Sequence, residues 1–253
     1  MSAPTNRLKA NLAKGQLQLG LWLSLCSPLA AEICAGRGFD WLLVDGEHAP
    51  NDLGTILSQL QSIAARDVPT VVRVPIGEPW VIKRVLDLGA QSILVPMVET
   101  VEQARAMVAA VRYPPRGIRG VGASYARASD FGAIRDYSTT ADDQICLIVQ
   151  VESRRGIANA GAIASLDGID GVFIGPADLS ADMGHLGNPA APEVQTAIAE
   201  TLAAIRAAGA AAGIIAPDPA DARRYIDLGA NFVALGGDAG LLSAAAAAVR
   251  AAF

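Results

Sequence analysis

Short apolar runs alternate along the chain with longer stretches of helical periodicity. The runs predict eight buried strands, at Leu17–Leu25, Trp41–Asp45, Thr70–Val74, Ser92–Pro96, Ile145–Val151, Gly171–Ile174, Ala211–Ile215 and Asn231–Gly236. Nearly continuous apolar strands are typical of parallel sheets covered on both faces. Helices are predicted between them, for example at Asp52–Ala65, Val101–Val111, Val194–Ala208 and Ala220–Leu228. Because each strand is followed by a helix, a closed (β/α)₈ barrel is favoured over an open doubly wound sheet.

The chain length and its glycine pattern agree with one barrel. The tetrapeptide Asp-Leu-Gly-Ala occurs at 87–90 and at 227–230, each time where a helix should end just before a strand. Glycine at such a position can adopt the left-handed conformation that closes a helix. A length of 253 residues suits one (β/α)₈ barrel, and no linker-like change of composition divides the chain. We therefore expect residues 1–253 to form a single domain.

Two segments depart from this alternation. Residues 112–144 form a long irregular stretch with several arginines, among them Arg116, Arg119 and Arg127. Loops of this length in compact domains are usually functional or disordered, so we expect this one to cover the mouth of the barrel. The last segment, Ala239–Phe253, predicts a helix that is apolar nearly all round. Such a helix needs burial on more than one side, which suggests a contact with another subunit.

Composition narrows the class of partner and the compartment. The net charge of −5 and the lack of any run of Lys and Arg argue against nucleic acid or an anionic membrane as the main partner. The polar N-terminus lacks the apolar core of a signal peptide, and no apolar stretch reaches the length of a membrane span. A cytoplasmic protein is expected. The three cysteines, Cys26, Cys34 and Cys146, are scattered in apolar segments and are interpreted as buried free thiols.

Polar residues gather where the predicted strands end. In barrels the chemistry takes place at the carboxyl ends of the strands, and polar groups at the end of an apolar strand are costly unless they are paired or used. The residues at or just after these ends are Trp22, Asp45, Glu47, His48, Arg73, Glu99, Gln150, Glu152, Asp178 and Gly236–Asp238. This cluster is the strongest functional signal in the chain.

Glu152 and Asp178 follow adjacent strands and could share one hard cation. Carboxylate oxygens together with water suit Mg²⁺ or Mn²⁺. Zinc held by histidines is disfavoured, because the chain has only two and they are far apart in the sequence. The alternative is that one of the two acids forms a salt bridge to Arg154 or Arg155.

His48 and Arg73, the other charged residues considered at this end, each have two interpretations, whereas Asp87 is expected elsewhere. His48 lies three residues after Asp45, and an Asp–His pair could orient the imidazole as a general base, although a histidine that merely caps the turn is the alternative. Arg73 lies in an apolar run and must meet a carboxylate, either Asp45 or Glu47 or that of the substrate. Asp87 ends the following helix and should lie far from the mouth of its own barrel, as a surface acid.

The distribution of lysine excludes one mechanism. The only lysines, Lys9, Lys14 and Lys83, lie outside the predicted strands. A Schiff-base aldolase needs a desolvated lysine inside the barrel. Enolate chemistry supported by a metal remains possible.

Several segments together resemble a known family. They are WLLVDGEHAPND, VVRVP, VLDLGAQSILVPMVET, YPPRGIRGVG, VQVES and IGPADLSADMG. They are similar to the HpcH/HpaI family of class II pyruvate aldolases, the hydroxy-ketoacid aldolases, and the similarity covers nearly the whole chain. It implies a barrel of the phosphoenolpyruvate/pyruvate-domain type. It also implies reversible, metal-dependent cleavage of a 4-hydroxy-2-ketoacid to pyruvate or hydroxypyruvate and an aldehyde.

The resemblance also implies roles for individual residues. Glu152 and Asp178 match the metal ligands, for Mg²⁺ or Mn²⁺ and possibly Co²⁺, and no nucleotide cofactor is implied. His48 matches the general base, and Arg73 matches the residue that stabilises the enolate.

Further residues match the substrate groups and the assembly of the family. Gln150 and the backbone at Ala177–Asp178 match the groups that bind the ketoacid. Asp87 matches an acid that raises the basicity of the histidine, and it would have to come from a neighbouring subunit. This fits a hexamer, a trimer of dimers, with an exchanged C-terminal helix. Trp22, Ile215 and the long loop are expected to shape the aldehyde pocket.

Three other functions were weighed. A lyase of the citrate or malyl-CoA type shares the metal and the arginine but needs a basic site for the CoA phosphates, and the chain has no lysine-rich patch. A phosphate-binding barrel isomerase or epimerase would rest on Gly236 and Gly237 after the last strand. A non-catalytic ketoacid-binding barrel would be excluded by metal-dependent cleavage.

Overall fold

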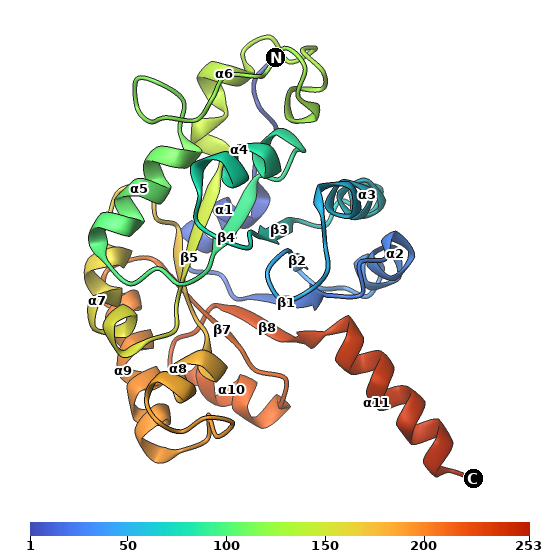
Figure 1. Cartoon of the computed structure of the whole chain (residues 1–253), viewed down its shortest axis with the longest axis vertical. Helices are drawn as coiled ribbons and strands as arrows, with labels where there is room; N and C mark the ends of the chain where they lie inside the picture. The colour runs from blue at the N-terminus through green and yellow to red at the C-terminus, as the bar shows by residue number, and fades with distance from the viewer.

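The strand β1 pairs with both β2 and β8, so that eight parallel strands close into a barrel (Figure 1). The structure is a computed structural model that describes residues 1–253. The strands are β1 Gln18–Leu23, β2 Trp41–Asp45, β3 Thr70–Arg73, β4 Ser92–Val95, β5 Cys146–Val151, β6 Gly171–Ile174, β7 Ala211–Ile215 and β8 Phe232–Gly237. All neighbouring pairs are parallel, because a helix returns the chain to the start of each new strand.

The helices surround the barrel. They are α1 Arg7–Ala13, α2 Pro28–Ala35, α3 Leu53–Ala64, α4 Pro79–Asp87, α5 Val101–Val111, α6 Tyr137–Thr140, α7 Arg154–Ala164, α8 Pro176–Asp182, α9 Pro192–Ala207, α10 Pro219–Asp227 and α11 Asp238–Ala251. Local sequence starts several of them: Asp52 and Thr100 form capping boxes at α3 and α5, and Ser153 caps α7 through its side chain. The predicted closed barrel is confirmed, and the predicted strands agree with the observed ones to within two residues at each end.

The core has two layers. The strand residues that point outward pack against the helices in a cluster of 48 buried residues, whereas those that point inward form a smaller cluster inside the barrel. In the inner cluster Trp41 stacks on Phe232, with ring centroids 4.0 Å apart. Gly20 makes room for this stack, because a Cβ there would lie 2.1 Å from the Trp41 ring. The helix α1, which the sequence analysis did not predict, supplies Leu8 and Leu12 to the inner cluster.

The long segment 112–144 lies at the end of the barrel where the strands begin. It leaves α5 and enters β5, and it contains α6 and two short 3₁₀ turns. It packs against the N-terminal segment, where the Ala3 amide donates to Thr140 Oγ1 (2.9 Å), and Figure 1 shows α6 beside the N-terminus. The expectation that it covers the mouth of its own barrel is wrong, because a connection from a helix to the next strand lies at the opposite end from the site.

The helix α11 extends away from the barrel in Figure 1, and every residue from 240 to 253 is exposed. Its apolar side chains include Leu241, Leu242 and Val249, all more than half exposed. The expected contact with another subunit stays a prediction.

The structure also tests the expectations of free, buried thiols and of a chain without a membrane span. The three thiols are free, as predicted, but only Cys146 is buried, while Cys26 and Cys34 are partly exposed because they flank or end α2 at the surface. None of the helices combines the length and the apolar character needed to cross a membrane.

Candidate active site

Three buried charged residues mark one end of the barrel. Asp45 is the last residue of β2, Arg73 is the last residue of β3, and Glu152 directly follows β5. Each is at most 4% exposed. Because parallel strands end at the same rim, these side chains converge, as the sequence predicts.

Arg73 is held on three sides. Its Nε and Nη2 donate to the two oxygens of Asp45 at 2.8 and 2.7 Å. Its Nη1 lies 2.7 Å from Oε2 of Glu47, and its guanidinium stacks over the ring of Trp22 at 4.3 Å. The prediction that Arg73 meets a carboxylate is confirmed, and both candidate acids contribute. Such a guanidinium is fixed in position before any ligand binds.

Asp45 does not orient the imidazole of His48. Its Oδ1 accepts hydrogen bonds from the backbone amides of Glu47 (3.0 Å) and His48 (3.4 Å), and so it shapes the loop after β2. The Asp45–imidazole pair is therefore not observed: Asp45 accepts from Arg73 and from the backbone of the loop instead. The imidazole is 67% exposed, and its acidic neighbour is Glu47, with Oε2 3.8 Å from Nε2.

Glu152 is a buried carboxylate that no Lys, Arg or His side chain pairs with. Its Oε1 accepts a hydrogen bond from the Met97 amide (2.9 Å), and Oε2 accepts one from the side-chain amide of Gln150. Burial raises the pKa of Glu152, and the nearby charges of Asp178 and Glu47 raise it further. Because a buried anion is costly unless it is compensated, this carboxylate needs either a proton or a cation.

Asp178 lies in the first turn of α8 and is exposed beside Ala177. Its charge raises the pKa of both Glu152 and Glu47, which places the three acids at one end of the barrel. The alternative of a salt bridge to the arginines of α7 is not observed. Arg155 instead lies 3.7 Å from Glu99, and Arg154 makes no ion pair.

The residues present fit a divalent ion. The chain has no group of three or more His, Cys, Asp and Glu side chains that could hold a metal. The carboxylates at this end that the sequence analysis assigned to an ion are Glu152 and Asp178. Mg²⁺ and Mn²⁺ bind through one or two carboxylates and complete their shell with water or substrate oxygens. Gly175 keeps the space beside Glu152 and Gln150 open, because a Cβ there would lie 2.4 Å from Glu152 Oε2 and 2.9 Å from Gln150 Nε2.

The predicted substrate-binding side chains lie around this centre. Gln150 is 3% exposed, and its Oε1 has no hydrogen-bond partner. Trp22 lies between Arg73 and Phe173, with ring centroids of Trp22 and Phe173 5.9 Å apart. Ile215, the last residue of β7, packs with Trp22 against the top of the inner cluster. These contacts place an apolar wall beside the charged groups.

Asp87 is not part of this site in its own chain. It ends α4, at the end of the barrel where the strands begin, and its Oδ1 accepts a hydrogen bond from Nη2 of Arg119 (2.9 Å). The Arg119 side chain is fully buried and stacks on Tyr113 at 4.5 Å. The sequence analysis expected this position within one chain but missed the partner, Arg119.

Two residues of the site were underrated from the sequence. Glu47 was considered only as a partner for Arg73, although it also approaches His48. Asp238, which follows Gly236 and Gly237, is buried at the start of α11 and accepts hydrogen bonds from Ser24 (2.8 Å, backbone) and Leu25 (3.3 Å). Its role is to hold the loop after β1, and the position of an acid after a strand was the signal for it.

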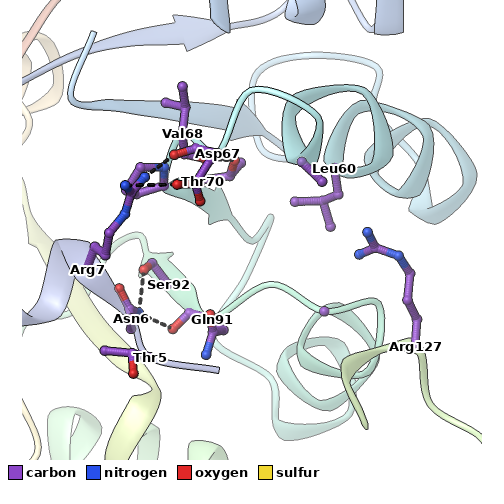
Figure 2. A pocket seen from close by; sticks show the side chains of 13 residues that line it. Thr5, Asn6, Arg7, Leu60, Asp67, Val68, Thr70, Gln91, Ser92 and Arg127 are labelled. Carbon is purple, nitrogen blue, oxygen red and sulfur yellow. Dashed lines mark hydrogen bonds and ion pairs between the residues drawn. The ribbon is translucent and has the colours of Figure 1, made fainter. Parts of the chain in front are cut away.

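A separate cavity of about 240 Å³ lies at the other end of the barrel (Figure 2). Its polar groups are engaged with one another: Arg7 pairs with Asp67 at 2.9 Å, and Asn6 donates to Ser92 Oγ at 3.0 Å. Arg127 enters from the opposite side and donates to the carbonyl of Leu88. None of the residues predicted for catalysis or binding lines this cavity, so the candidate site is the one at the carboxyl ends of the strands.

Known proteins share this architecture and length. Residues 18–245 match the family described as HpcH/HpaI aldolase/citrate lyase. The chain is 58% identical, over 98% of its length and 90% of the relative, to a hydroxypyruvate/pyruvate aldolase of Deinococcus radiodurans. It is 54% identical, over 98% of its length and 94% of the relative, to a 4-hydroxy-2-oxo-heptane-1,7-dioate aldolase of Salmonella dublin.

A solved structure of a family member has the same fold. The crystal structure of an HpcH/HpaI aldolase/citrate lyase family protein from Burkholderia cenocepacia superposes with a TM-score of 0.93 at 46% sequence identity, covering 98% of this chain and 99% of the other. Family match, relatives and fold agree with one another. The chain belongs to the HpcH/HpaI aldolase/citrate lyase family.

Proposed function

We propose that this chain is a divalent-metal-dependent aldolase that reversibly cleaves 4-hydroxy-2-ketoacids to pyruvate or hydroxypyruvate and an aldehyde. The observation that carries the proposal is Glu152, a buried carboxylate that accepts hydrogen bonds from the Met97 amide and from Gln150 and has no Lys or Arg partner. Relatives named for hydroxypyruvate, pyruvate and a 4-hydroxy-2-oxo acid support the substrate class.

Glu152 and Asp178 would hold the ion, with Mg²⁺ and Mn²⁺ preferred by the donor set and Co²⁺ tolerated. A divalent ion in this position supplies Lewis acidity to the carbonyl of the ketoacid. Gln150 and the backbone at Ala177–Asp178 would bind the carboxylate end of the ketoacid. The unpartnered Oε1 of Gln150 indicates that this side chain retains hydrogen-bonding capacity.

Arg73 would stabilise the oxygen that becomes negative when the carbon–carbon bond breaks. Its guanidinium is fixed by Asp45, Glu47 and Trp22, so that its remaining N–H groups have a defined direction. Fixed donors aimed at a developing oxyanion require no reorganisation during the reaction. Asp45 acts here as the residue that positions Arg73.

His48 would be the general base. In cleavage it takes the proton of the C4 hydroxyl, the C4 oxygen becomes the carbonyl of the aldehyde, and the electrons of the C3–C4 bond form the enolate of the ketoacid. A proton from solvent then reaches the enolate carbon and gives the ketoacid product, and His48 returns its own proton to solvent. The exposed imidazole suits this exchange, because it can reach both substrate and solvent. Trp22 and Ile215 would line the aldehyde side of the pocket.

The active assembly would be a hexamer, a trimer of dimers, in which α11 is exchanged between subunits. The exposed apolar residues of α11 support a contact with another chain. Asp87, at the far end of its own barrel, would then approach His48 of a neighbour and raise its basicity. A cytoplasmic location stays a prediction.

The test is the release of pyruvate from 4-hydroxy-2-ketoacids by the purified chain. Activity should vanish after complete chelation and return with Mg²⁺, Mn²⁺ or Co²⁺, and Glu152→Gln and His48→Ala should each lower kcat by at least about a hundredfold. Glu193→Gln, which changes an exposed acid of α9 away from the site, serves as the control. Full activity after chelation would exclude the proposal, and a requirement for coenzyme A would favour the lyase alternative.

A further inference from the structure

Glu47 contacts two residues with different proposed roles. Arg73 would stabilise the developing oxyanion, and His48 would take up the proton. It lies in the loop between β2 and α3, directly before His48, and its side chain is 16% exposed. The loop is folded back on the strand end, because Asp45 accepts from both amides of the pair. The Glu47 carboxylate is thereby directed toward Arg73 on β3 as well as toward His48.

One oxygen of Glu47 serves both neighbours. Oε2 lies 2.7 Å from Nη1 of Arg73 and 3.8 Å from Nε2 of His48. The same buried atom makes no aligned hydrogen bond. The contact with Arg73 is therefore a close charge pair, and Oε2 keeps the capacity to accept a hydrogen bond. A buried acceptor with unused capacity is costly unless it is used at some stage of function.

The charges around Glu47 come from several elements. Burial raises the pKa of Glu47 most strongly, and Arg73 and His48 oppose this shift. The carboxylates of Asp45 on β2 and Asp178 on α8 raise the same pKa. Glu47 in turn contributes to the raised pKa of Glu152 after β5. Arg73 on β3 is thus the cation that stabilises the ionised form of Glu47 among the other carboxylates at this end of the barrel.

We propose that Glu47 is a positioning residue that holds the guanidinium of Arg73 and the imidazole of His48 around one substrate and compensates the imidazolium when His48 is protonated. This inference rests on the proposed function for the roles of Arg73 and His48. The proton of the C4 hydroxyl goes to His48 and stays there until synthesis or solvent exchange removes it. Glu47 takes up no proton and remains the anion that both cations face.

The loss of this charge should change kinetics in a specific way. Glu47→Gln keeps the size of the side chain but removes the anion, so kcat should fall about tenfold to a hundredfold while KM for the ketoacid changes little. The acid limb of the pH dependence of kcat/KM should move to lower pH, because an imidazolium without an opposite charge nearby loses its proton more easily. Glu47→Asp should restore part of kcat and of the pH limb.

The matched control is Glu102→Gln. Glu102 is an exposed acid in the first turn of α5, at the end of the barrel where the strands end, and it forms no ion pair with Arg73 or His48. This variant should have the same kcat and the same acid limb in the pH dependence of kcat/KM as the wild type. An effect of equal size in both variants would overturn the proposal, because it would reflect the general charge of the mouth.

A second measurement does not depend on turnover. The chain has only two histidines, so the ring resonances of His48 can be followed by NMR, with His185 as the reference in the same spectrum. Glu47→Gln should shift the ring resonances of His48 and leave those of His185 unchanged. If wild-type protein shows no ketoacid cleavage, the proposed function fails while this measurement still tests the contact between Glu47 and His48. Unchanged His48 resonances, or a Glu47→Gln enzyme with wild-type kcat, would overturn the inference.

Discussion

The carboxylate of Asp45 meets the guanidinium of Arg73 edge to edge, with Nε–Oδ1 and Nη2–Oδ2 distances of 2.8 and 2.7 Å. Both side chains are almost completely buried, so each compensates the charge of the other. Arg73→Lys cannot make the two parallel bonds. We expect kcat/KM to fall about a hundredfold and the free energy of unfolding to fall by about 2–4 kcal/mol.

Steady-state kinetics and urea unfolding measure these two effects. Asp45→Asn is the complementary variant, because it keeps the shape of the pair and removes its negative charge. It should lower stability and activity together, since Arg73 loses its main anchor. Wild-type kcat/KM in Arg73→Lys would show that the fork geometry does not matter for the reaction.

Gly175→Ala should weaken binding of the divalent ion without unfolding the barrel. The new Cβ would lie 2.4 Å from Glu152 Oε2, so the carboxylate or the backbone must move. Displacing a ligand or its support typically costs tenfold to a hundredfold in metal affinity, and we expect about tenfold or more here. Titration with Mn²⁺, followed by electron paramagnetic resonance, measures the affinity.

Gly161→Ala is the control for this substitution. Gly161 lies within α7, where a Cβ would make an ordinary contact of 3.7 Å with Ala204. Alanine there should leave ion affinity unchanged and raise stability by about 0.5–1 kcal/mol, because alanine is the better helix former. Equal Mn²⁺ affinity in Gly175→Ala and wild type would contradict the assigned site.

Binding of the divalent ion should become tighter as the pH rises from about 4.5 toward neutrality. Burial raises the pKa of Glu152, so the folded chain without a metal binds this proton more strongly than the unfolded chain does. By linkage, this group makes the metal-free protein less stable as the pH rises through the raised pKa. A bound divalent ion needs the ionised carboxylate and reverses this trend.

Thermal unfolding across this pH range, with EDTA or with Mg²⁺, tests the expectation. The increase in Tm caused by Mg²⁺ should grow with pH in wild type and should be absent in Glu152→Gln. An increase in Tm that is independent of pH would show that Glu152 does not gain or lose a proton when the ion binds.

The barrel was predictable because its signals are local. Continuous apolar strands occur once per repeat, and glycines close the chain before most of them, so the strand ends were placed to within two residues. The same positions located Arg73, Glu152 and Asp178, because a charged residue at the end of an apolar strand has few places to lie.

The failures concern contacts that depend on geometry in three dimensions. The spacing of Asp45 and His48 suggested an imidazole pair, but the orientation of the strand gave both oxygens of Asp45 to Arg73. The segment 112–144 was assigned to the wrong end, because composition was considered without the direction of the connection. The helix α1, which supplies Leu8 and Leu12 to the inner cluster, has too short an apolar pattern to be predicted as a helix from sequence alone.

Leu8→Ala should separate stability from catalysis. Leu8 of α1 is fully buried in the inner cluster, at the end of the barrel opposite to the candidate site. Its truncation should cost about 2–5 kcal/mol of unfolding free energy and leave kcat unchanged below the unfolding transition. Leu29→Ala, at a 66% exposed position, should change stability by less than about 0.5 kcal/mol. A large fall of kcat in folded Leu8→Ala would show that the two ends of the barrel are coupled.

Two inactive variants should restore each other if His48 and Asp87 act across a subunit boundary. In one chain they lie at opposite ends of the barrel, and Arg119 holds Asp87 there by a bond of 2.9 Å. His48→Ala and Asp87→Asn chains, co-expressed in equal amounts with different tags and purified through both, form mixed assemblies. With random mixing, about a quarter of the sites receive both native residues, because each site draws its two residues independently from two chains.

The activity of the mixed assemblies should therefore approach about a quarter of that of the wild type, well above either variant alone. Each variant, prepared separately with both tags, provides the baseline. Mixed assemblies that stay at this baseline would show that Asp87 does not complete a neighbour's site. Asp87 would then serve to compensate Arg119, whose fully buried guanidinium has no other acidic partner.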